Sequence, residues 1–244
     1  MTAERTRDAP CPGVQITQPK RGFRYGSEAF WMVGRALLTR PGARTGLDLG
    51  TGSGIGAALL AARGVAAVGV DAWDAWAPLW DETLASSTVA ADLSLRVCDV
   101  RAFHADAPFD VVISNPPYFP AGTGPVAPDP WRAAARTEGG AALDDFVAAA
   151  CRSVAEDGVI VFVLPLVRAS EAVVGFTRHG RGRCGVVSVG DRRALVIAGD
   201  GAPSVPEVVV EGDEAATLWY AVATGAARRA DSRLDGLARS RSPG

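Results

Sequence analysis

Residues 115–118 (Asn-Pro-Pro-Tyr) place an amide side chain, a proline carbonyl and an aromatic ring within one short turn. Oδ1 of Asn115 and the carbonyl oxygen of Pro116 can accept the two hydrogens of a planar amine, and they stabilise positive charge that develops on its nitrogen. The ring of Tyr118 can stack on a flat substrate and set its plane. We therefore predict Asn115, Pro116 and Tyr118 as catalytic residues for transfer to a poorly nucleophilic amine, with Pro117 and Tyr118 contacting the substrate.

A glycine loop forms the second chemical pattern. Asp48 is followed by Gly50, Gly52 and Gly54 at every second position, between a predicted strand and a predicted helix. Glycine permits positive φ and lets a ligand lie directly against the backbone, and the N-terminus of the next helix offers free N–H groups. This combination favours a nucleotide-like ligand over a tight turn that binds nothing.

Two kinds of ligand fit this loop. Gly52, Gly54 and Ala57 match the loose dinucleotide fingerprint, and Asp71 lies at the distance expected of a carboxylate that binds ribose hydroxyls. Asp48, however, would repel a pyrophosphate, because both groups are anions. It suits the α-amino group of S-adenosyl-methionine, which carries a sulfonium and no phosphate, so the residues favour this cofactor.

The glycine loop, Asp71 and residues 115–118 together resemble the class I methyltransferases that act on planar amines, over roughly residues 15–198. Two flanking segments resemble the tRNA(Val) N6-adenine methyltransferase family, which modifies the adenine beside the anticodon. These segments are Gln18–Tyr25 (Gln-Pro-Lys-Arg-Gly-Phe-Arg-Tyr) and Ala135–Glu138 (Ala-Arg-Thr-Glu), the latter followed by Leu143–Phe146 (Leu-Asp-Asp-Phe).

The resemblance implies a role for each matching residue. Asp48 and the backbone of the glycine loop would hold the methionine end of the cofactor, Asp71 its ribose, and Asp99 with Val100 its adenine. Asp99 is equally consistent with an exposed carboxylate at a strand end. The implied cofactor-binding residues are Asp48, Gly50, Thr51, Gly52, Gly54, Asp71, Asp99, Val100 and Asn115, and the implied substrate contacts are Arg24, Tyr25, Pro117 and Tyr118.

Alternating strands and helices must position these groups. The apolar run at residues 109–113 is typical of a strand that is buried on both faces. The alternation predicts an α/β fold with a doubly wound, mostly parallel seven-stranded sheet and an antiparallel closing hairpin. The resemblance implies that this is the Rossmann-like methyltransferase fold. Strands are predicted at residues 45–49, 66–70, 93–97, 109–114 and 158–165, the hairpin at 186–189 and 194–198, and helices at 27–40, from the glycine loop to about 63, and at 72–86, 143–154 and 168–176.

The remaining segments carry weaker patterns. We expect a flexible N-terminal tail over residues 1–13, a single methyltransferase domain over residues 14–225, and a disordered Arg-rich tail over residues 226–244. The Pro- and Gly-rich loop at residues 119–131 is long for an α/β connection and is a candidate substrate loop. Trp73, Trp76 and Trp80 recur at helical spacing, which favours packing on a helix face.

Composition narrows the class of protein. The chain has 244 residues, 48% of them hydrophobic, and a net charge of −2, so no overall positive charge indicates a nucleic-acid partner, although one local basic face would suffice. The four cysteines have no metal-ligand spacing, and no apolar run approaches the ~18 residues of a membrane span. We expect a reduced, cytoplasmic protein without a metal ion or a membrane anchor.

These observations converge on methyl transfer from S-adenosyl-methionine to the exocyclic N6 amine of an adenine in RNA, with tRNA favoured. Methylation of a glutamine amide in a protein such as a release factor is an alternative, because an amide is also a planar, weak nucleophile. Those enzymes carry a helical N-terminal domain, whereas only 46 residues precede Leu47. Small-molecule N-methylation also fits the acidic pI, and a non-catalytic, cofactor-binding, RNA-associated protein is the rival from outside the enzymes.

Overall fold

The computed structural model describes residues 4–22, 24–118, 140–203, 207–209 and 214–226. The strands are β1 (Arg5–Cys11), β2 (Val14–Pro19), β3 (Thr45–Leu49), β4 (Ala66–Asp71), β5 (Leu93–Val97), β6 (Phe109–Ser114), β7 (Val154–Pro165), β8 (Cys184–Val189), β9 (Arg193–Ala198) and β10 (Glu207–Val209). The α-helices are α1 (Ser27–Thr39), α2 (Ile55–Ala61), α3 (Ala77–Ser86), α5 (Leu143–Ser153), α6 (Ala169–Arg178) and α7 (Glu214–Thr224), and the short 3₁₀ helices are η1 (Asp74–Trp76), η2 (Ala90–Asp92) and η3 (Leu166–Arg168).

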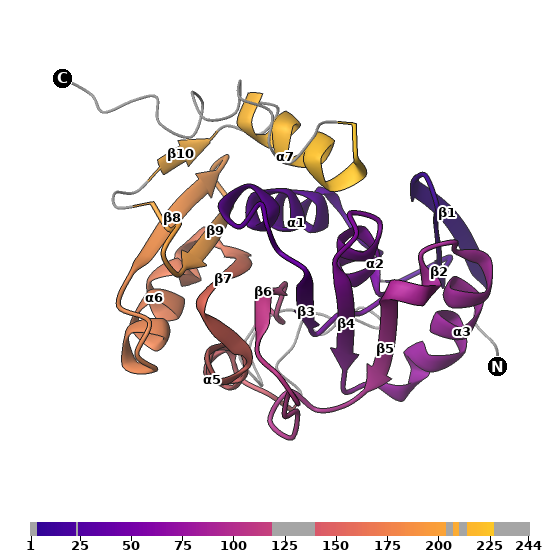
Figure 1. Ribbon diagram of the computed structural model, residues 1–244, viewed down its shortest axis with the longest axis horizontal. Helices are drawn as coiled ribbons and strands as arrows, with labels where there is room; N and C mark the ends of the chain where they lie inside the picture. The colour runs from indigo at the N-terminus through magenta and orange to yellow at the C-terminus, as the bar shows by residue number, and fades with distance from the viewer. Residues whose placement is uncertain (1–3, 23, 119–139, 204–206, 210–213, 227–244) are drawn as a thin grey trace.

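The main sheet has the strand order β10-β8-β9-β7-β6-β3-β4-β5. Neighbouring strands are parallel except around β9, which runs antiparallel to both β7 and β8. Figure 1 shows α1 and α7 on one side of the strands and α5 and α6 on the other. The predicted Rossmann-like, doubly wound sheet with its antiparallel hairpin is confirmed, and β10 adds a short eighth strand at its edge.

The central strands are apolar because both of their faces are covered. In β6, Val111 and Ile113 belong to the core that α1 and α2 also form, while Val112 belongs to the core under α5 and α6. All three side chains are fully buried. Because the faces alternate along a strand, a strand between two helical layers needs apolar residues at almost every position, which is the pattern that the sequence shows.

The predicted flexible tail over residues 1–13 is wrong for the residues that the structure describes. Residues 5–11 form β1, which pairs antiparallel with β2. The hairpin is fixed to α3, since the N–H of Thr17 donates to Oγ1 of Thr83 over 3.0 Å. Arg5 and Arg7 of β1 pair with Glu82 of α3, far away in sequence, so the segment has a polar pattern although it belongs to the fold. The hairpin thus packs against the domain that was predicted to begin at residue 14.

The C-terminal region contributes α7, which the sequence pattern did not predict. Trp219 is 2% exposed, and Tyr220 stacks on Phe30 of α1 with ring centroids 4.4 Å apart. A Cβ at Gly34 would lie 2.0 Å from the carbonyl oxygen of Trp219, so a glycine is needed where the two helices cross. The candidate substrate loop at 119–131, the segment Ala135–Glu138 and residues 227–244 lie outside the described residues.

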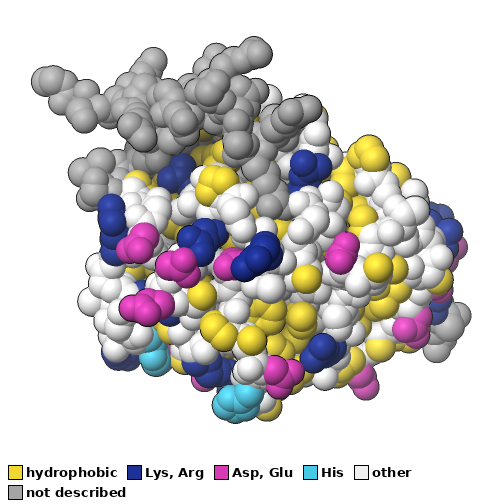
Figure 2. Space-filling model, in the orientation of Figure 1, with side chains coloured by type: hydrophobic (Ala, Val, Ile, Leu, Met, Phe, Trp, Pro, Cys, Tyr) yellow, Lys and Arg dark blue, Asp and Glu magenta, His cyan; other side chains and the backbone are white. Residues whose placement is uncertain are grey.

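The described surface carries charges of both signs. On the face shown in Figure 2, Lys and Arg side chains are interspersed with Asp and Glu. None of the helices in the described ranges has the length and hydrophobicity that a membrane span requires. Among these same residues, no cluster of three or more His, Cys, Asp or Glu side chains could hold a metal ion. All four cysteines are free.

Candidate active site

A cavity of about 390 Å³ opens at the ends of β3, β4 and β6, where the predicted site residues meet. Such volumes are typical of small-molecule sites, at roughly 300–1,000 Å³. The sequence-predicted residues that line it are Tyr25, Asp48, Gly50, Thr51, Gly52, Asp71, Asp99, Val100, Asn115 and Pro117. Gly54, Pro116, Tyr118 and Arg24 are the predicted residues that do not line it.

Asp48 is a buried carboxylate on the wall of this cavity. Its Oδ2 accepts hydrogen bonds from Oγ1 of Thr51 (2.6 Å) and from the N–H of Ala57 (3.1 Å). Burial raises the pKa of Asp48 to about 7, although these hydrogen bonds lower it in part. A Cβ at Gly56 would lie only 2.5 Å from Oδ2, so the glycine makes room for the carboxylate. A cation in the cavity would stabilise the ionised form of Asp48.

The glycine loop has the backbone that its composition predicts. Gly50, Gly52 and Gly54 have φ values of 69°, 53° and 84°, in the left-handed region that glycine adopts without strain. Gly54 is the N-cap of α2, so it shapes the entry to this helix rather than the cavity wall. The bare backbone at Gly50 and Gly52 forms part of the wall.

Asp71 ties the glycine loop to the end of β4. Its Oδ2 accepts from the N–H of Gly52 (2.9 Å) and its Oδ1 from the N–H of Trp73 (3.0 Å), while burial raises its pKa. Each carboxylate oxygen has a second lone pair that could accept from a ligand hydroxyl. The half-buried carboxyl of Asp71 and the buried carboxyl of Asp48 both disfavour an anionic ligand.

Asp99 combines both of the roles that its sequence position allows. It lines the cavity next to Val100, and its side chain is 32% exposed and pairs with Arg101 over 2.6 Å. The hydrogen bonds from Arg101 hold the pKa of Asp99 below its usual range. The carboxylate is thus a preformed, ionised group at the rim of the cavity.

Two tryptophans that were assigned to helix packing also line the cavity. Trp73 and Trp76 form part of its wall and meet edge to face, with ring centroids 6.1 Å apart. Trp80 is buried, and its Nε1 donates to the carbonyl of Gly52 over 2.8 Å. The predicted helix at 72–86 begins only at Ala77, after the 3₁₀ turn η1. The aromatic residues directly after Asp71 were the available signal for this wall.

Other wall residues could not be recognised from sequence. They come from the apolar faces of α1 and α5 and from the segments that precede these two helices, where a wall residue and a core residue look alike. Among them are Gly26, Ala29, Met32, Gly140, Ala141 and Phe146.

Asn115 presents an unsatisfied acceptor at the opposite wall. Its Oδ1 is buried and has no hydrogen-bond partner among the described residues. Ser114, the last residue of β6, donates through Oγ to the carbonyl of Leu49 over 2.7 Å, which fixes β6 against β3 at this edge. Pro116 is buried and Pro117 lines the cavity. A buried acceptor without a donor is costly, so this oxygen is suited to a ligand N–H.

Tyr118 and Arg24 occupy places other than the expected ones. The ring of Tyr118 lies against Arg193, whose Cζ is 4.9 Å from the ring centroid, and burial raises the pKa of the phenol. Arg24 is exposed and pairs with Asp8 over 2.7 Å in an open polar cleft along the β1–β2 hairpin. Tyr25 lines both this cleft and the cavity, so the two spaces are adjacent.

The chain is similar in sequence to known methyltransferases. Residues 32–166 match the family model described as "Methyltransferase small domain". The chain is 36% identical over 159 residues to the tRNA1(Val) (adenine(37)-N6)-methyltransferase of Aeromonas hydrophila, a match that covers 64% of this chain and 65% of that protein. It is 31% identical over 188 residues to the protein of the same name from Edwardsiella ictaluri, covering 69% of this chain and 74% of the relative.

A solved structure supports the fold assignment. The S-adenosyl-methionine-dependent methyltransferase from Agrobacterium tumefaciens superimposes with a TM-score of 0.55 at 15% sequence identity, covering 82% of this chain and 71% of that one. At this identity the likeness concerns the fold alone. This chain therefore shares its overall fold with a methyltransferase.

Proposed function

Because this chain belongs to the methyltransferase small domain family, we propose that it transfers a methyl group from S-adenosyl-methionine to the N6 amine of an adenine in tRNA. The proposal extends to this chain the activity for which its relatives are named. The match spans just under two thirds of the Aeromonas hydrophila protein, at 65% of its length. The substrate is therefore argued below from the residues of this chain.

The described cavity wall fits S-adenosyl-methionine better than a dinucleotide. Asp48 is buried and Asp71 half-buried, burial raises the pKa of both carboxyls, and a pyrophosphate beside them would add a third negative group. An α-amino group would instead pair with Asp48, and ribose hydroxyls could donate to Asp71. We assign Gly50, Thr51 and Gly52 to the methionine end.

The remaining assignments concern the adenine of the cofactor and its reactive methyl group. We place the cofactor adenine beside Val100, with Asp99 at the rim of the cavity and Trp73 on its wall. When bound, the cofactor supplies an electrophilic methyl group on its sulfonium.

The observation that carries the proposal is the free acceptor on Asn115. Asn115 lines the same cavity, and its buried Oδ1 has no partner among the described residues, so a substrate N–H that reached it would satisfy it. Holding the amine hydrogens lets the nitrogen become pyramidal, and the same oxygen stabilises the positive charge that develops on it. An exocyclic adenine amine is planar and weakly nucleophilic, so it requires this help and no strong base.

The remaining substrate contacts are assigned to the rest of the 115–118 turn and to Arg24 and Tyr25. We assign the carbonyl of Pro116 as the second acceptor and Pro117 as a contact of the substrate base. Stacking by Tyr118 requires the ring face that Arg193 does not cover. Arg24 and Tyr25, next to the cavity, are assigned to contacts with the RNA around the target base.

A labelled-methyl assay tests the proposal. Total tRNA, rRNA and protein from the source organism are incubated with the purified chain and methyl-labelled cofactor, and labelled RNA is digested to nucleosides. Label in N6-methyladenosine from tRNA is expected, and Asn115→Ala protein serves as the matched control. Label confined to protein would replace this function with glutamine methylation, and label in none of the three fractions would point to a small-molecule acceptor.

A further inference from the structure

The turn at residues 115–118 can do little to hold its own backbone in place. The pairing of β6 with β7 ends at Ser114. Pro116 and Pro117 have no backbone N–H, so neither residue can donate a hydrogen bond to a strand or within a turn. The carbonyl groups of the turn nevertheless need donors where they are shielded from water. Other segments of the chain must therefore supply much of what fixes this turn.

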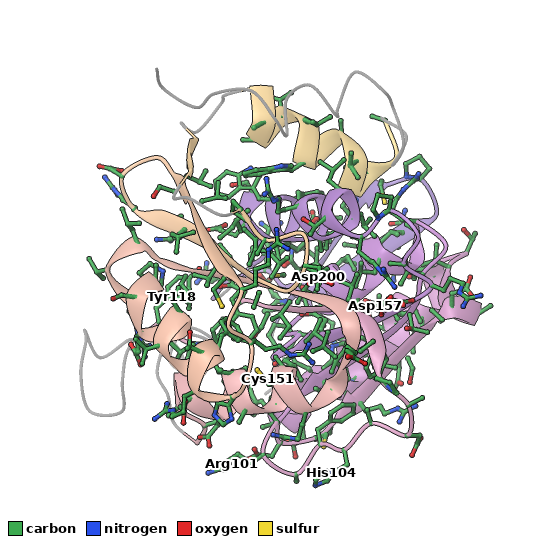
Figure 3. The ribbon with its side chains drawn as sticks, turned by 60° about the vertical axis from the view of Figure 1, so that its left-hand side comes forward. Arg101, His104, Tyr118, Cys151, Asp157 and Asp200 are labelled. Carbon is green, nitrogen blue, oxygen red and sulfur yellow. The ribbon has the colours of Figure 1, made fainter. Side chains whose placement is uncertain are left out.

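Arg168 supplies such a donor. Its Nη1 donates to the carbonyl oxygen of Tyr118 over 3.2 Å and to that of Pro117 over 3.4 Å. Pro117 lines the cavity, so these contacts reach the wall of the candidate active site. Figure 3 labels Tyr118 on the side of the molecule formed by the C-terminal half of the chain, to which Arg168 belongs. Arg168 thus joins the turn after β6 to the segment that follows β7.

The sheet topology explains why Arg168 reaches this turn. β6 and β7 are parallel neighbours, so their C-terminal ends lie at the same edge of the sheet. β7 ends at Pro165, and Arg168 is the last residue of η3, which follows directly. The N–H of Leu166 donates to the carbonyl of Arg192 over 2.9 Å, which ties η3 to the start of β9. The arginine therefore extends from a segment that is itself fixed to the sheet.

The guanidinium of Arg168 is oriented by Glu171, in the first turn of α6. Its Nε lies 2.8 Å from Oε2 and its Nη2 lies 2.7 Å from Oε1, a bidentate pair that fixes the plane of the group. The third nitrogen, Nη1, is the one that meets the turn. The Arg168 side chain is 10% exposed, so water competes little for these contacts. The donor is therefore in place before a substrate binds.

We propose that Arg168 is a positioning residue for methyl transfer, which holds the backbone of the 115–118 turn so that Asn115 and the Pro116 carbonyl stay aligned with the acceptor amine. The inference rests on the roles proposed above for Asn115 and Pro116. It concerns the main chain of the turn, so it applies to any planar amine acceptor. Alignment matters because misplacing a reacting group by about 1 Å can lower a rate about 100-fold.

The first test is Arg168→Met, which removes the donor and keeps an apolar side chain of similar length. Glu171 is 54% exposed, so its carboxylate stays hydrated and the variant should fold. We expect kcat per cofactor-binding site, measured on the acceptor that the labelled-methyl assay identifies, to fall about 10- to 100-fold. Affinity for S-adenosyl-homocysteine should stay within about threefold. A loss of this affinity as large as the loss of kcat would mean a general loosening of the cavity and would contradict a positioning role.

Arg168→Lys separates the shape of the guanidinium from its charge and keeps the test decisive if Arg168→Met does not fold. The ammonium group retains the charge but lacks the planar fork, so it cannot pair bidentately with Glu171 and also hold both carbonyls. We expect kcat to fall about three- to tenfold. Wild-type kcat in this variant would reduce the role of Arg168 to its charge and would refute the proposed restraint.

The turn can also be observed without any acceptor. Asn115 is the only asparagine of the chain. Selective ¹⁵N labelling of asparagine therefore gives one backbone amide signal and one side-chain NH₂ group in the NMR spectrum. We expect both to shift in Arg168→Met and in Arg168→Lys. Because the spectrum needs no methyl acceptor, it distinguishes a failure of this arrangement from a failure of the proposed RNA substrate.

Arg178→Met is the matched control. It removes an arginine from the other end of α6, where the side chain pairs with Asp144 and is 62% exposed. Its kcat and its Asn115 signals should equal those of the wild-type protein. The proposal requires that both quantities change in Arg168→Met and that neither changes in the control. Wild-type kcat in Arg168→Met, or a lowered kcat with unmoved Asn115 signals, would overturn it.

Discussion

On the glycine-loop side of the cavity, carboxylates are held by groups nearby in sequence, whereas the Asn115 side is held by side chains from distant elements. Asp48 accepts from groups three and nine positions along the chain. Asp71 accepts from backbone N–H groups two and nineteen positions away. The turn at 115–118 depends instead on Arg168, which is 50 positions from Tyr118, and on Arg193, whose partner Glu28 is 165 positions away.

Because different contacts hold the two sides of the cavity, a substitution on one side should leave the function of the other side largely unchanged. Local backbone contacts form whenever β3, β4 and α2 form, so the cofactor side is preorganised by the parallel sheet itself. The acceptor side is complete only when β9, η3 and α1 have packed together. Substitutions on one side should therefore change cofactor affinity, and substitutions on the other should change the rate of transfer.

The largest effect expected on the acceptor side comes from Asn115→Ala. Removing the group that receives the amine hydrogens should lower kcat by about 100-fold or more. Isothermal titration should still detect cofactor binding within about threefold of the wild-type affinity, because the contacts of Asp48 and Asp71 are untouched. A parallel loss of cofactor affinity would show that the two sides are coupled.

The corresponding change on the cofactor side is Asp48→Asn. The amide can still accept from Thr51 and Ala57, but it cannot pair with a cation, so cofactor affinity should fall about 10- to 100-fold. S-adenosyl-homocysteine, which has the same amino group, should lose affinity to a similar extent. With saturating cofactor, kcat should be nearly retained, and a collapse of kcat would assign Asp48 to the transfer step.

The pH dependence of stability and of cofactor affinity tests the role of Asp48 further. Burial raises the pKa of Asp48 to about 7, so the ligand-free fold binds this proton more tightly than the unfolded chain does. This group therefore stabilises the ligand-free protein fully at low pH, and its contribution declines as pH rises from about 4 to about 7. Cofactor affinity should change in the opposite sense and weaken about tenfold per pH unit below 7.

Thermal unfolding and titration of the Asp48→Asn protein complete this pH experiment. The variant should lose most of the pH dependence of its stability and of its cofactor affinity, because its amide does not titrate. A wild-type pH profile in the variant would mean that another group, rather than Asp48, causes it.

The smallest effect is expected for Trp80→Phe, which removes a single hydrogen bond on the cofactor side of the cavity. An aromatic ring remains, but the bond from Nε1 to the carbonyl of Gly52 is lost. The free energy of unfolding should fall by about 1 kcal/mol, and cofactor affinity should fall less than fivefold. Chemical denaturation and titration measure the two quantities. A change in kcat at saturating cofactor would contradict the separation of the two sides.

Much of the site could be predicted because its signals are short-range. Asp48 and the loop glycines encode a turn whose φ values only glycine adopts easily, and the apolar run of β6 ends directly at Asn115. Trp73 and Trp76 were assigned to packing, because an aromatic residue on a helix face has the same sequence signature whether it meets a core or a ligand. The hairpin β1–β2 and α7 were missed because their partners, α3 and α1, lie far away in sequence.

The sequence alone determined the order of strands and helices from α1 to β9, the glycine turn and the chemistry of the Asn115 turn, since each depends on neighbouring residues and on the period of burial. Only the tertiary structure decided which arginines lie against the ring and the backbone of the Tyr118 turn. The reason is physical. A guanidinium forms its contacts through space, and the antiparallel course of β9, not its distance along the chain, brings Arg193 to the edge where the parallel strands end.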